Sequence, residues 1–283
     1  IKVEGPTGDD TRTWQPPVRD GVSTYYLGVN RNKRSIVLDL KQPAGRDALL
    51  RLAVKADVLA YNIRPQAMAR LGLGYEELRA VNPRILYVGA FGFGQDGPNA
   101  DKPAYDDLMQ GVTGIAWLMQ QSGSPEPRYT PLTLVDRIIG LNVVNAVTSA
   151  LYHRERSGKG QRVDVPMFES MAQFVLGDHM GGRTFEPPTG PVGYPRVMVP
   201  ERRPYRTRDG YLSVLIYNDR QWQNFFAAIG REDILRDDPR WSERAAAFGS
   251  RFSIVRMLTT AGPTFSTRSA KSGSPRTAAE SAV

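Results

Sequence analysis

Short apolar runs and longer amphipathic segments alternate along the chain as far as about residue 176. The apolar runs are rich in β-branched residues, which is typical of strands buried in a parallel sheet. The segments between them repeat their apolar residues at the spacing of a helix. The predicted strands are residues 34–40, 57–62, 84–94 and 161–167. The predicted helices are residues 43–56, 105–120, 137–160 and 168–176, and residues 68–82 are expected to form one helix or two. This alternation predicts an α/β fold, with a Rossmann-like parallel sheet and flanking helices.

The helix predicted over residues 137–160 is apolar on nearly all sides. A helix without a polar face is usually buried inside a large assembly or at a subunit interface. Arg154 and Arg156 favour its C-terminal end, and Gly158 is expected to cap it. The charge-free stretch from Ile138 to Tyr152 is shorter than the roughly 20 residues that cross a bilayer, so no membrane partner is expected.

The composition changes after residue 176, and four regions are expected along the chain. Residues 1–176 form a large Rossmann-like domain, whose first strand-helix unit is expected to be missing because the chain enters at IKVEGP. Residues 177–203 are rich in Gly, Pro and Arg, which predicts a linker. A tight Asp209-Gly210 turn predicts the start of a smaller domain over residues 204–250. Residues 251–283 lack periodicity and are expected to form a tail that is either disordered or unrelated to the rest of the fold.

The composition excludes several kinds of chemistry. The chain has 283 residues, of which 41% are hydrophobic, and this is enough for a sizeable core. It contains no cysteine and two histidines, so we expect no disulfide, no thiolate nucleophile and no metal site. Because no secretory leader pattern is present, we expect a cytoplasmic protein. The net charge of +8 favours an anionic partner such as a phosphorylated small molecule, and nucleic acid is not expected because its binding motifs are absent.

Asp136 is an ionisable residue directly before the most apolar helix of the chain. At that position an aspartate most often caps the helix by accepting backbone N–H groups. The positive end of the helix dipole would also favour the charged form of its carboxylate. Asp136 is therefore a candidate for a carboxylate that stays ionised near neutral pH.

Three other signals are weaker. The segment GAFGFGQDG lacks the spacing of a phosphate-binding loop, so it predicts a turn near the active site. His153, late in the long helix, is predicted to be a surface or interface residue rather than a base. Asp106 and Asp107 are adjacent and would point to different sides of a helix, so they do not form a catalytic pair.

Seven segments of the chain stand in a recognisable order and spacing: IKVE, NRNKRSIVLDL, ADVLAYNIRP, LGLGYEEL, NPRILYVGAFGFGQDGP, AYDDLMQGVTG and ALYHRERSGKGQRVDV. In this order they resemble the family III CoA-transferases, or CaiB/BaiF family, which includes formyl-CoA and crotonobetainyl-CoA transferases. The resemblance is dense to about residue 175 and thinner to about residue 245, so we expect a chain truncated at both ends. It implies transfer of coenzyme A between an acyl-CoA and a free carboxylic acid. It further implies an interlocked homodimer without a tightly bound cofactor.

The same resemblance assigns the site residues. It implies that Asp136 is the nucleophile, which forms an aspartyl anhydride and then an aspartyl-CoA thioester. Four basic residues among the implied contacts suit the 3′-phosphate and the pyrophosphate of CoA. The implied CoA-binding residues are Leu38, Asp39, Leu40, Lys41, Asn62, Ile63, Arg64, Arg70, Lys102, Pro103, Ala104, Tyr105 and Asp106.

Two alternatives to a transferase stay open. The racemases that resemble this family carry a histidine three residues after the TG of the preceding helix, and Trp117 stands there in this chain. Without an imidazole, two-base proton transfer loses one partner, so a transferase is favoured over a racemase. The other alternative is a noncatalytic truncated remnant. The acyl donor and the acceptor acid stay open, because the second domain, where the resemblance is thin, carries most of the specificity surface.

Overall fold

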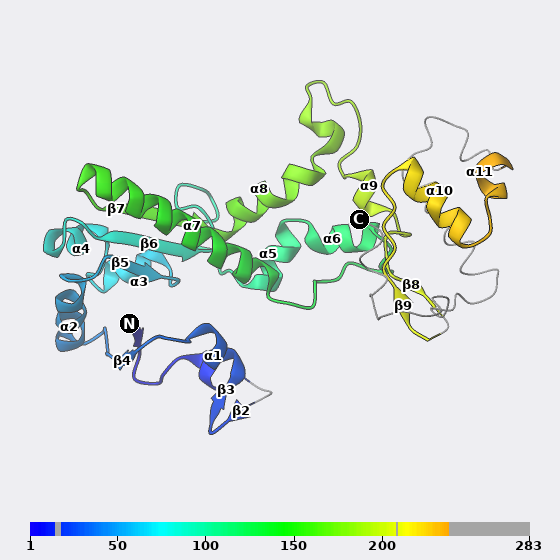
Figure 1. The fold of residues 1–283 in the computed structure, drawn as a ribbon. Helices are drawn as coiled ribbons and strands as arrows, with labels where there is room; N and C mark the ends of the chain where they lie inside the picture. Colours follow the sequence, from blue (N-terminus) through cyan, green and yellow to red (C-terminus); the bar gives the residue numbers. More distant parts are fainter. Residues whose placement is uncertain (15–17, 208, 238–283) are drawn as a thin grey trace. The chain divides into compact units, whose positions relative to one another are not determined.

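The structure is a computed structural model that describes residues 1–14, 18–207 and 209–237 (Figure 1). These residues belong to two compact units. The first unit consists of Ile1–Thr113 and Thr130–Phe174, and the second contains Gly114–Tyr129 and the described residues after Phe174. The predicted tail over residues 251–283 and the end of the predicted smaller domain lie outside the described residues.

A parallel sheet forms the centre of the first unit. Strands β5 (Val58–Tyr61), β6 (Leu86–Phe91) and β7 (Gln161–Pro166) pair in that order, with β6 in the middle (Figure 1). A separate parallel pair joins β1 (Lys2–Glu4) to β4 (Ser35–Val37). The predicted α/β fold with a Rossmann-like parallel sheet is confirmed, and each of the four predicted strands is shorter than its apolar run.

Helices cover both faces of the three-stranded sheet. Successive side chains of β6 point to opposite faces, so the two groups of helices pack against different residues of this strand. The helices of the first unit are α1 (Thr24–Val29), α2 (Pro43–Ala53), α3 (Pro65–Arg70), α4 (Tyr75–Val81), α5 (Asp106–Val112), α7 (Leu134–Ser157) and the start of α8 (Met167–His179). Tyr87 belongs to the core with α2, α3 and α4, whereas Leu86 and Val88 pack with α7. A strand buried on both faces has a continuous apolar sequence, which explains why β6 was predictable.

Helix α7 ends where the sequence predicts. Gly158 caps it in the left-handed conformation, with a φ of 74°, and donates its N–H to the carbonyl of Arg154. One side of α7 packs against the sheet, whereas Leu141 and Val144 are 70% and 62% exposed in the single chain. Among the described residues, α7 is the one helix long and apolar enough to cross a membrane, a property that core helices of soluble proteins share.

The single helix predicted over residues 105–120 is wrong, because the structure has two helices there. Helix α5 ends at Val112 in the first unit, and α6 (Ile115–Gln121) begins in the second. Gly114 separates them with a φ of 86°, a left-handed conformation that a continuous helix does not contain. The apolar spacing continues across this glycine, so periodicity alone does not show the break.

The second unit contains short elements around an aromatic core. Beyond α6 and the end of α8, its elements are η2 (Gly181–Thr184), α9 (Pro195–Met198), β8 (Tyr205–Arg206), β9 (Tyr211–Leu212), α10 (Asp219–Ala228) and α11 (Asp233–Asp237). The predicted Asp209-Gly210 turn lies between the antiparallel strands β8 and β9, and the Thr207 N–H donates to the Gly210 carbonyl at 2.9 Å. The buried core residues are Tyr205, Ile216, Trp222, Phe226 and Ile234.

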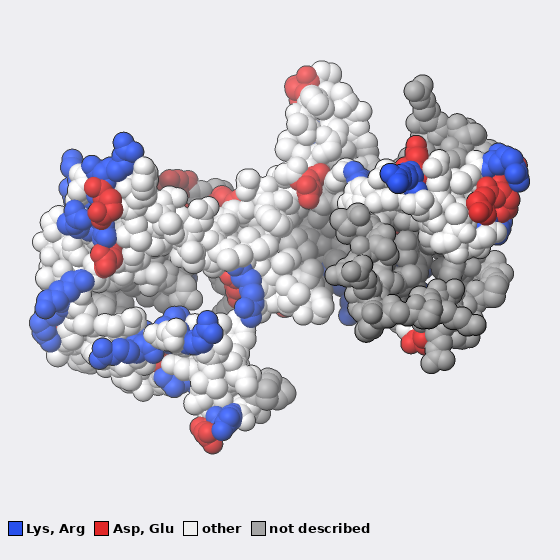
Figure 2. All heavy atoms as spheres, viewed as in Figure 1, with Lys and Arg blue, Asp and Glu red and all other residues white. Residues whose placement is uncertain are grey.

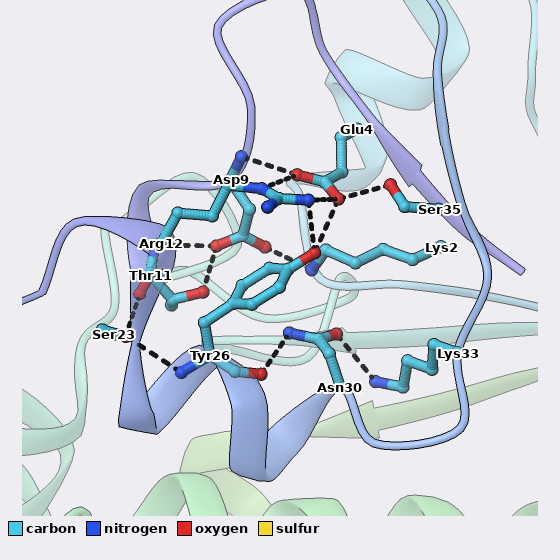
Figure 3. Close-up of polar contacts among 10 residues, drawn as sticks. All are labelled: Lys2, Glu4, Asp9, Thr11, Arg12, Ser23, Tyr26, Asn30, Lys33 and Ser35. Atoms are coloured by element: carbon cyan, nitrogen blue, oxygen red, sulfur yellow. Dashed lines mark hydrogen bonds and ion pairs between the residues drawn. The ribbon is translucent and has the colours of Figure 1, made fainter. Parts of the chain in front are cut away.

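A buried carboxylate fastens the N-terminal segment to the β1–β4 pair (Figure 3). Glu4 is 5% exposed and accepts two hydrogen bonds of 2.8 Å from Arg12, the last residue of the short helix η1 (Asp10–Arg12). The hydroxyls of Tyr26 and Ser35 also donate to it, at 2.9 Å and 2.5 Å. The Arg12 guanidinium, acting against the burial of the group, holds the pKa of Glu4 well below its usual range. These partners are distant in sequence, so periodicity gave no signal for this network.

Glu4→Gln is expected to destabilise the protein in a pH-dependent way. Because folding lowers the pKa of Glu4, its stabilising contribution is complete above the unfolded pKa of about 4.3 and is lost as the pH falls below that value. At neutral pH we expect Glu4→Gln to lower the free energy of unfolding by roughly 2 kcal/mol in urea titrations. Glu76→Gln, which removes one partner of an exposed ion pair, is the control. A loss for Glu4→Gln that stays constant down to about pH 3 contradicts this account.

Candidate active site

The loops that carry most of the predicted CoA contacts follow the carboxyl ends of parallel strands. Residues 38–41 follow β4, residues 62–64 follow β5, and residues 102–106 end the loop that leaves β6. Ligands of parallel α/β sheets bind outside this edge. Each of these predicted segments therefore lies at the carboxyl end of a parallel strand, although β4 belongs to a separate strand pair.

Packing and hydrogen bonding shape the turn at residues 38–41. Leu38 and Leu40 pack against the core shared with α2, α3 and α4, so a ligand could not readily use their side chains. Asp39 accepts the backbone N–H of Lys41 at 3.0 Å, which fixes the turn. Helix α2 approaches this turn closely at Gly45, where an added Cβ would lie 2.0 Å from the Asp39 carbonyl oxygen. Lys41 itself is exposed and is the member of the turn best placed to bind an anion.

Four exposed cations of the predicted site have no ion pair or side-chain hydrogen bond with any other described residue: Lys41, Arg64, Arg70 and Lys102. By contrast, Arg154 is 7% exposed and bonds to backbone carbonyls just before β5 and β6. Figure 2 shows basic side chains gathered over the part of the first unit that contains α2 and β4. The free cations are therefore available to an anionic ligand, whereas Arg154 holds the fold together.

The remaining predicted contacts lie in two short segments. Asn62 and Ile63 are exposed and connect β5 to Arg64, which immediately precedes α3. In the second segment Pro103 is exposed, Ala104 is half-buried, and Tyr105, directly before α5, is 72% exposed. Asp106 begins α5.

The glycine-rich loop after β6 holds residues 102–106 close to the strand. An added Cβ on Gly92 would lie 2.3 Å from the Cβ of Ala104, so only glycine permits this approach. The loop is also bonded to α8, because the Gly94 N–H donates to Glu169 at 2.8 Å. The Phe168 N–H donates to the Gly92 carbonyl at 2.9 Å. These contacts make the loop a rigid support for the segment that leads to Asp106.

Asp136 is the third residue of α7, and its side chain does not cap the helix. Its backbone N–H instead donates to Oδ2 of Asp106 at 2.9 Å. The Asp136 carboxylate is exposed and accepts no hydrogen bond from any described residue. The alternative interpretation of Asp136 as a helix cap is therefore wrong: Asp106, supplied by α5, accepts an N–H of the first turn of α7. Two carboxylates that sequence reasoning treated separately lie together.

Burial raises the pKa of the Asp136 carboxyl, the negative charge of Asp106 raises it further, and Arg137 opposes both. Although Asp136 is accessible to solvent, the surrounding protein partly desolvates its carboxylate. The helix dipole alone would lower this pKa, so the expected direction is wrong, because burial and the charge of Asp106 both act against the dipole. A carboxylate with a raised pKa is a stronger base, and a better nucleophile when it is ionised.

Gln110 was missed by sequence reasoning. It is fully buried on α5, one helical turn after Asp106, and its amide Nε2 donates to Oδ1 of Asp106 at 2.7 Å. The i,i+4 spacing of an aspartate and a glutamine was the available signal.

Of the weaker candidates, His153 is exposed on α7, as predicted, and Trp117 is 41% exposed on α6. Within the described part of the chain, no group of three His, Asp or Glu side chains could hold a metal ion.

A parallel sheet is covered on both faces, and near its carboxyl edge lie cations without a partner among the described residues. These features define an α/β protein suited to a phosphorylated ligand. The sequence matches the family model described as CoA-transferase family III over residues 1–267. The chain belongs to that family, which confirms the resemblance carried by the seven segments.

The chain is also similar to named CoA-transferases and to a solved structure of a CaiB/BaiF family protein. The chain is 34% identical to a succinate–glutarate CoA-transferase of Agrobacterium fabrum, over 92% of this chain and 66% of the relative. It is 47% identical to an acetyl-CoA:oxalate CoA-transferase of Acetobacter aceti, over 62% of this chain and 45% of the relative. The crystal structure of a CaiB/BaiF family protein from Brucella suis matches with a TM-score of 0.74 and 32% identity, over 91% of this chain and 68% of that one. The chain thus spans about half to two thirds of the length of these curated relatives.

Gly92→Ala is expected to displace the segment at residues 102–106, because the new methyl group would overlap Ala104. We expect a loss of about 2 kcal/mol in the free energy of unfolding. Adding Ala104→Gly to the same chain should recover most of that loss. Gly28→Ala, whose added Cβ would have no atom within 4 Å, is the control. Urea titrations measure these three variants and the Ala104→Gly single variant, and strictly additive effects of the two substitutions would show that the contact is absent.

Proposed function

We propose that this protein transfers coenzyme A between an acyl-CoA thioester and a free carboxylic acid, with Asp136 as the nucleophile. The observation that carries the proposal is an exposed Asp136 carboxylate that accepts no hydrogen bond from the described residues, because its helix takes a cap from Asp106 instead. Membership of CoA-transferase family III supports the reaction class. The named activities of two relatives, which act on dicarboxylic acids, support a carboxylic acid as acceptor.

The reaction proceeds through covalent intermediates on one side chain. Asp136 attacks the thioester carbonyl, the C–S bond breaks, and the departing CoA thiolate leaves a mixed anhydride. The thiolate then attacks the aspartyl carbonyl, which releases the first acyl group as a carboxylate and forms an aspartyl-CoA thioester. The acceptor carboxylate displaces the thiolate to form a second anhydride. Attack of the thiolate on the new acyl carbonyl releases the product and regenerates Asp136.

The free cations of the first unit are suited to hold CoA during these steps. Lys41, Arg64, Arg70 and Lys102 would neutralise the 3′-phosphate and the pyrophosphate, with arginine able to bind phosphate through two hydrogen bonds. The backbone of residues 38–40 and 62–63, together with Pro103 and Ala104, would line the path of the pantetheine arm. The exposed ring of Tyr105 offers a further apolar surface.

We also infer that the active form is a cytoplasmic homodimer. The outer side of α7 exposes Leu141, Val144 and Tyr152, and a second copy of the chain would remove this apolar surface from water. Such cover close to Asp136 would also exclude water from the anhydride and the thioester, which are both prone to hydrolysis.

Asp136→Asn is expected to abolish exchange of isotopic label between an acyl-CoA and its free acid, because an amide cannot form the anhydride. Asp107→Asn is the matched control, since Asp107 is an exposed aspartate on α5. A panel of acyl-CoA donors with succinate, oxalate and formate as acceptors would identify the substrates. If Asp136→Asn still exchanges label between the acyl-CoA and its free acid, the proposal is wrong.

Two other outcomes of this assay identify the alternatives. Deuterium uptake from solvent at the α-carbon without an acceptor acid would indicate a racemase, against the expectation from Trp117. A chain that folds and binds CoA, but shows neither exchange nor deuterium uptake, would be a noncatalytic remnant.

Arg70→Met is expected to weaken CoA binding about tenfold, because a charge-assisted hydrogen bond to phosphate is lost. Isothermal titration with CoA and with 3′-dephospho-CoA separates the two phosphate sites: a residue that binds the 3′-phosphate loses its effect with the dephosphorylated ligand. Arg51→Met, which removes another exposed cation of the first unit, is the control. Equal affinities of wild type and Arg70→Met for CoA would show that Arg70 does not bind CoA.

A further inference from the structure

Gln110 uses its whole hydrogen-bonding capacity inside the protein. It is fully buried, and its Nε2 donates to Oδ1 of Asp106 at 2.7 Å and to the Leu132 carbonyl at 3.5 Å. Its Oε1 accepts the Thr130 backbone N–H at 2.8 Å and the Thr130 hydroxyl at 2.9 Å. A primary amide has two donor hydrogens and two acceptor lone pairs, so all four positions are occupied.

The partners fix which way the Gln110 amide points. A backbone N–H can only donate, so the amide atom that faces Thr130 must be the oxygen. An ionised carboxylate can only accept, so the atom that faces Asp106 must be the nitrogen. Gln110 therefore links the start of α5 to residues 130–132, the segment that leads directly into α7.

The orientation of Gln110 decides where the two oxygens of Asp106 lie. With Oδ1 held by Gln110, Oδ2 accepts the backbone N–H of Asp136. Asp106 thus takes the place at the first turn of α7 that an aspartate on that turn would otherwise occupy. The side chain of Asp136 is left without a hydrogen bond to its own helix.

We propose that Gln110 is a positioning residue for the transfer reaction, which holds Asp106 against the first turn of α7 and so leaves the Asp136 carboxylate free to attack. The inference rests on the proposed function only in that Asp136 is the attacking group. Gln110 itself touches no reacting atom, because it is buried behind Asp106.

Loss of the Gln110 amide has a definite electrostatic consequence. The charged groups that face Asp136 are Asp106 from α5 and Arg137 from α7, and Arg137 lies 5.9 Å from the ring centre of Tyr25 on α1. If Asp106 moves away, Asp136 loses a nearby negative charge and gains access to the end of its own helix. Both changes favour the ionised form of Asp136 and make it a weaker nucleophile.

The test compares Gln110→Met with Asp106→Asn, with the double variant and with wild type, all in the full chain. Methionine keeps the unbranched shape and removes every hydrogen bond. For Gln110→Met we expect kcat to fall ten- to a hundredfold, because the nucleophile is misplaced. The KM of this variant for acyl-CoA should stay within about twofold of wild type, because CoA binding is intact. The acid limb of the kcat profile should move to lower pH. Gln173→Met, an exposed glutamine on α8, is the control.

The double variant distinguishes a positioning role from general destabilisation. Because Gln110 acts through Asp106, Gln110→Met should have little further effect on kcat in the Asp106→Asn background. If Gln110→Met does not fold, Thr130→Val removes one of the four bonds and should act in the same direction with a smaller effect. An unchanged kcat and pH profile in soluble Gln110→Met, or full additivity with Asp106→Asn, overturns the inference.

A carbon-13 NMR titration of the Asp136 carboxyl tests the inference without turnover. We expect the pKa of Asp136 to be lower in Gln110→Met than in wild type, and an identical pKa would overturn the inference. If exchange survives Asp136→Asn, the proposed function fails while this titration still reports on Gln110. If Asp136→Asn abolishes exchange and the Gln110 variants behave as wild type, only the inference about Gln110 fails.

Discussion

The hydrogen bond from the Asp136 backbone N–H to Asp106 is the contact on which the candidate site depends. The first turn of a helix has N–H groups without intrahelical partners, and an aspartate within that turn would ordinarily satisfy one of them. Here the acceptor comes from α5, and the side chain of Asp136 makes no hydrogen bond to its own helix. Burial raises the pKa of Asp136, and the negative charge that this contact brings close raises it further. One interaction thus leaves the side chain of the proposed nucleophile free of its own helix and adds to the effect of burial on its basicity.

The parallel sheet provides the rest of the site by topology. With β6 buried on both faces and helices packed on each side, the connecting loops at the carboxyl edge are the segments free to carry charge. Two close approaches, at Gly45 and Gly92, shape the loops that hold Lys41 and Lys102. Buried Arg154 bonds the end of α7 to the backbone before β5 and β6, whereas the cations of the predicted site have no described partner. Basic residues of one chain therefore serve two separate purposes, fastening elements together and facing a ligand.

Sequence reasoning succeeded where the determinants are local and failed where they are distant. The apolar run of β6 and the Gly158 cap of α7 are written in consecutive residues, and both were predicted. Asp136 and the CoA contacts came from the resemblance to a family. The break at Gly114 was missed because apolar spacing continues through it. The Glu4 network and the bonds of Gln110 to Thr130 join residues far apart in sequence, so no periodicity could reveal them. The raised pKa of Asp136, which comes from burial first and from the charge of Asp106 second, depends on residues that are distant in sequence, so its direction was not predicted either.

Oxygen-18 transfer tests the central claim most directly. When the acceptor acid carries ¹⁸O in its carboxylate, the oxygen that bridges the second anhydride stays on the aspartate after the thiolate releases the product. Trypsin would cut after Arg128 and Arg137, giving a peptide of residues 129–137 in which Asp136 is the only acidic side chain. After turnover with labelled acceptor, this peptide should carry ¹⁸O on Asp136. CoA exchange that proceeds while the peptide keeps its natural mass would contradict the account.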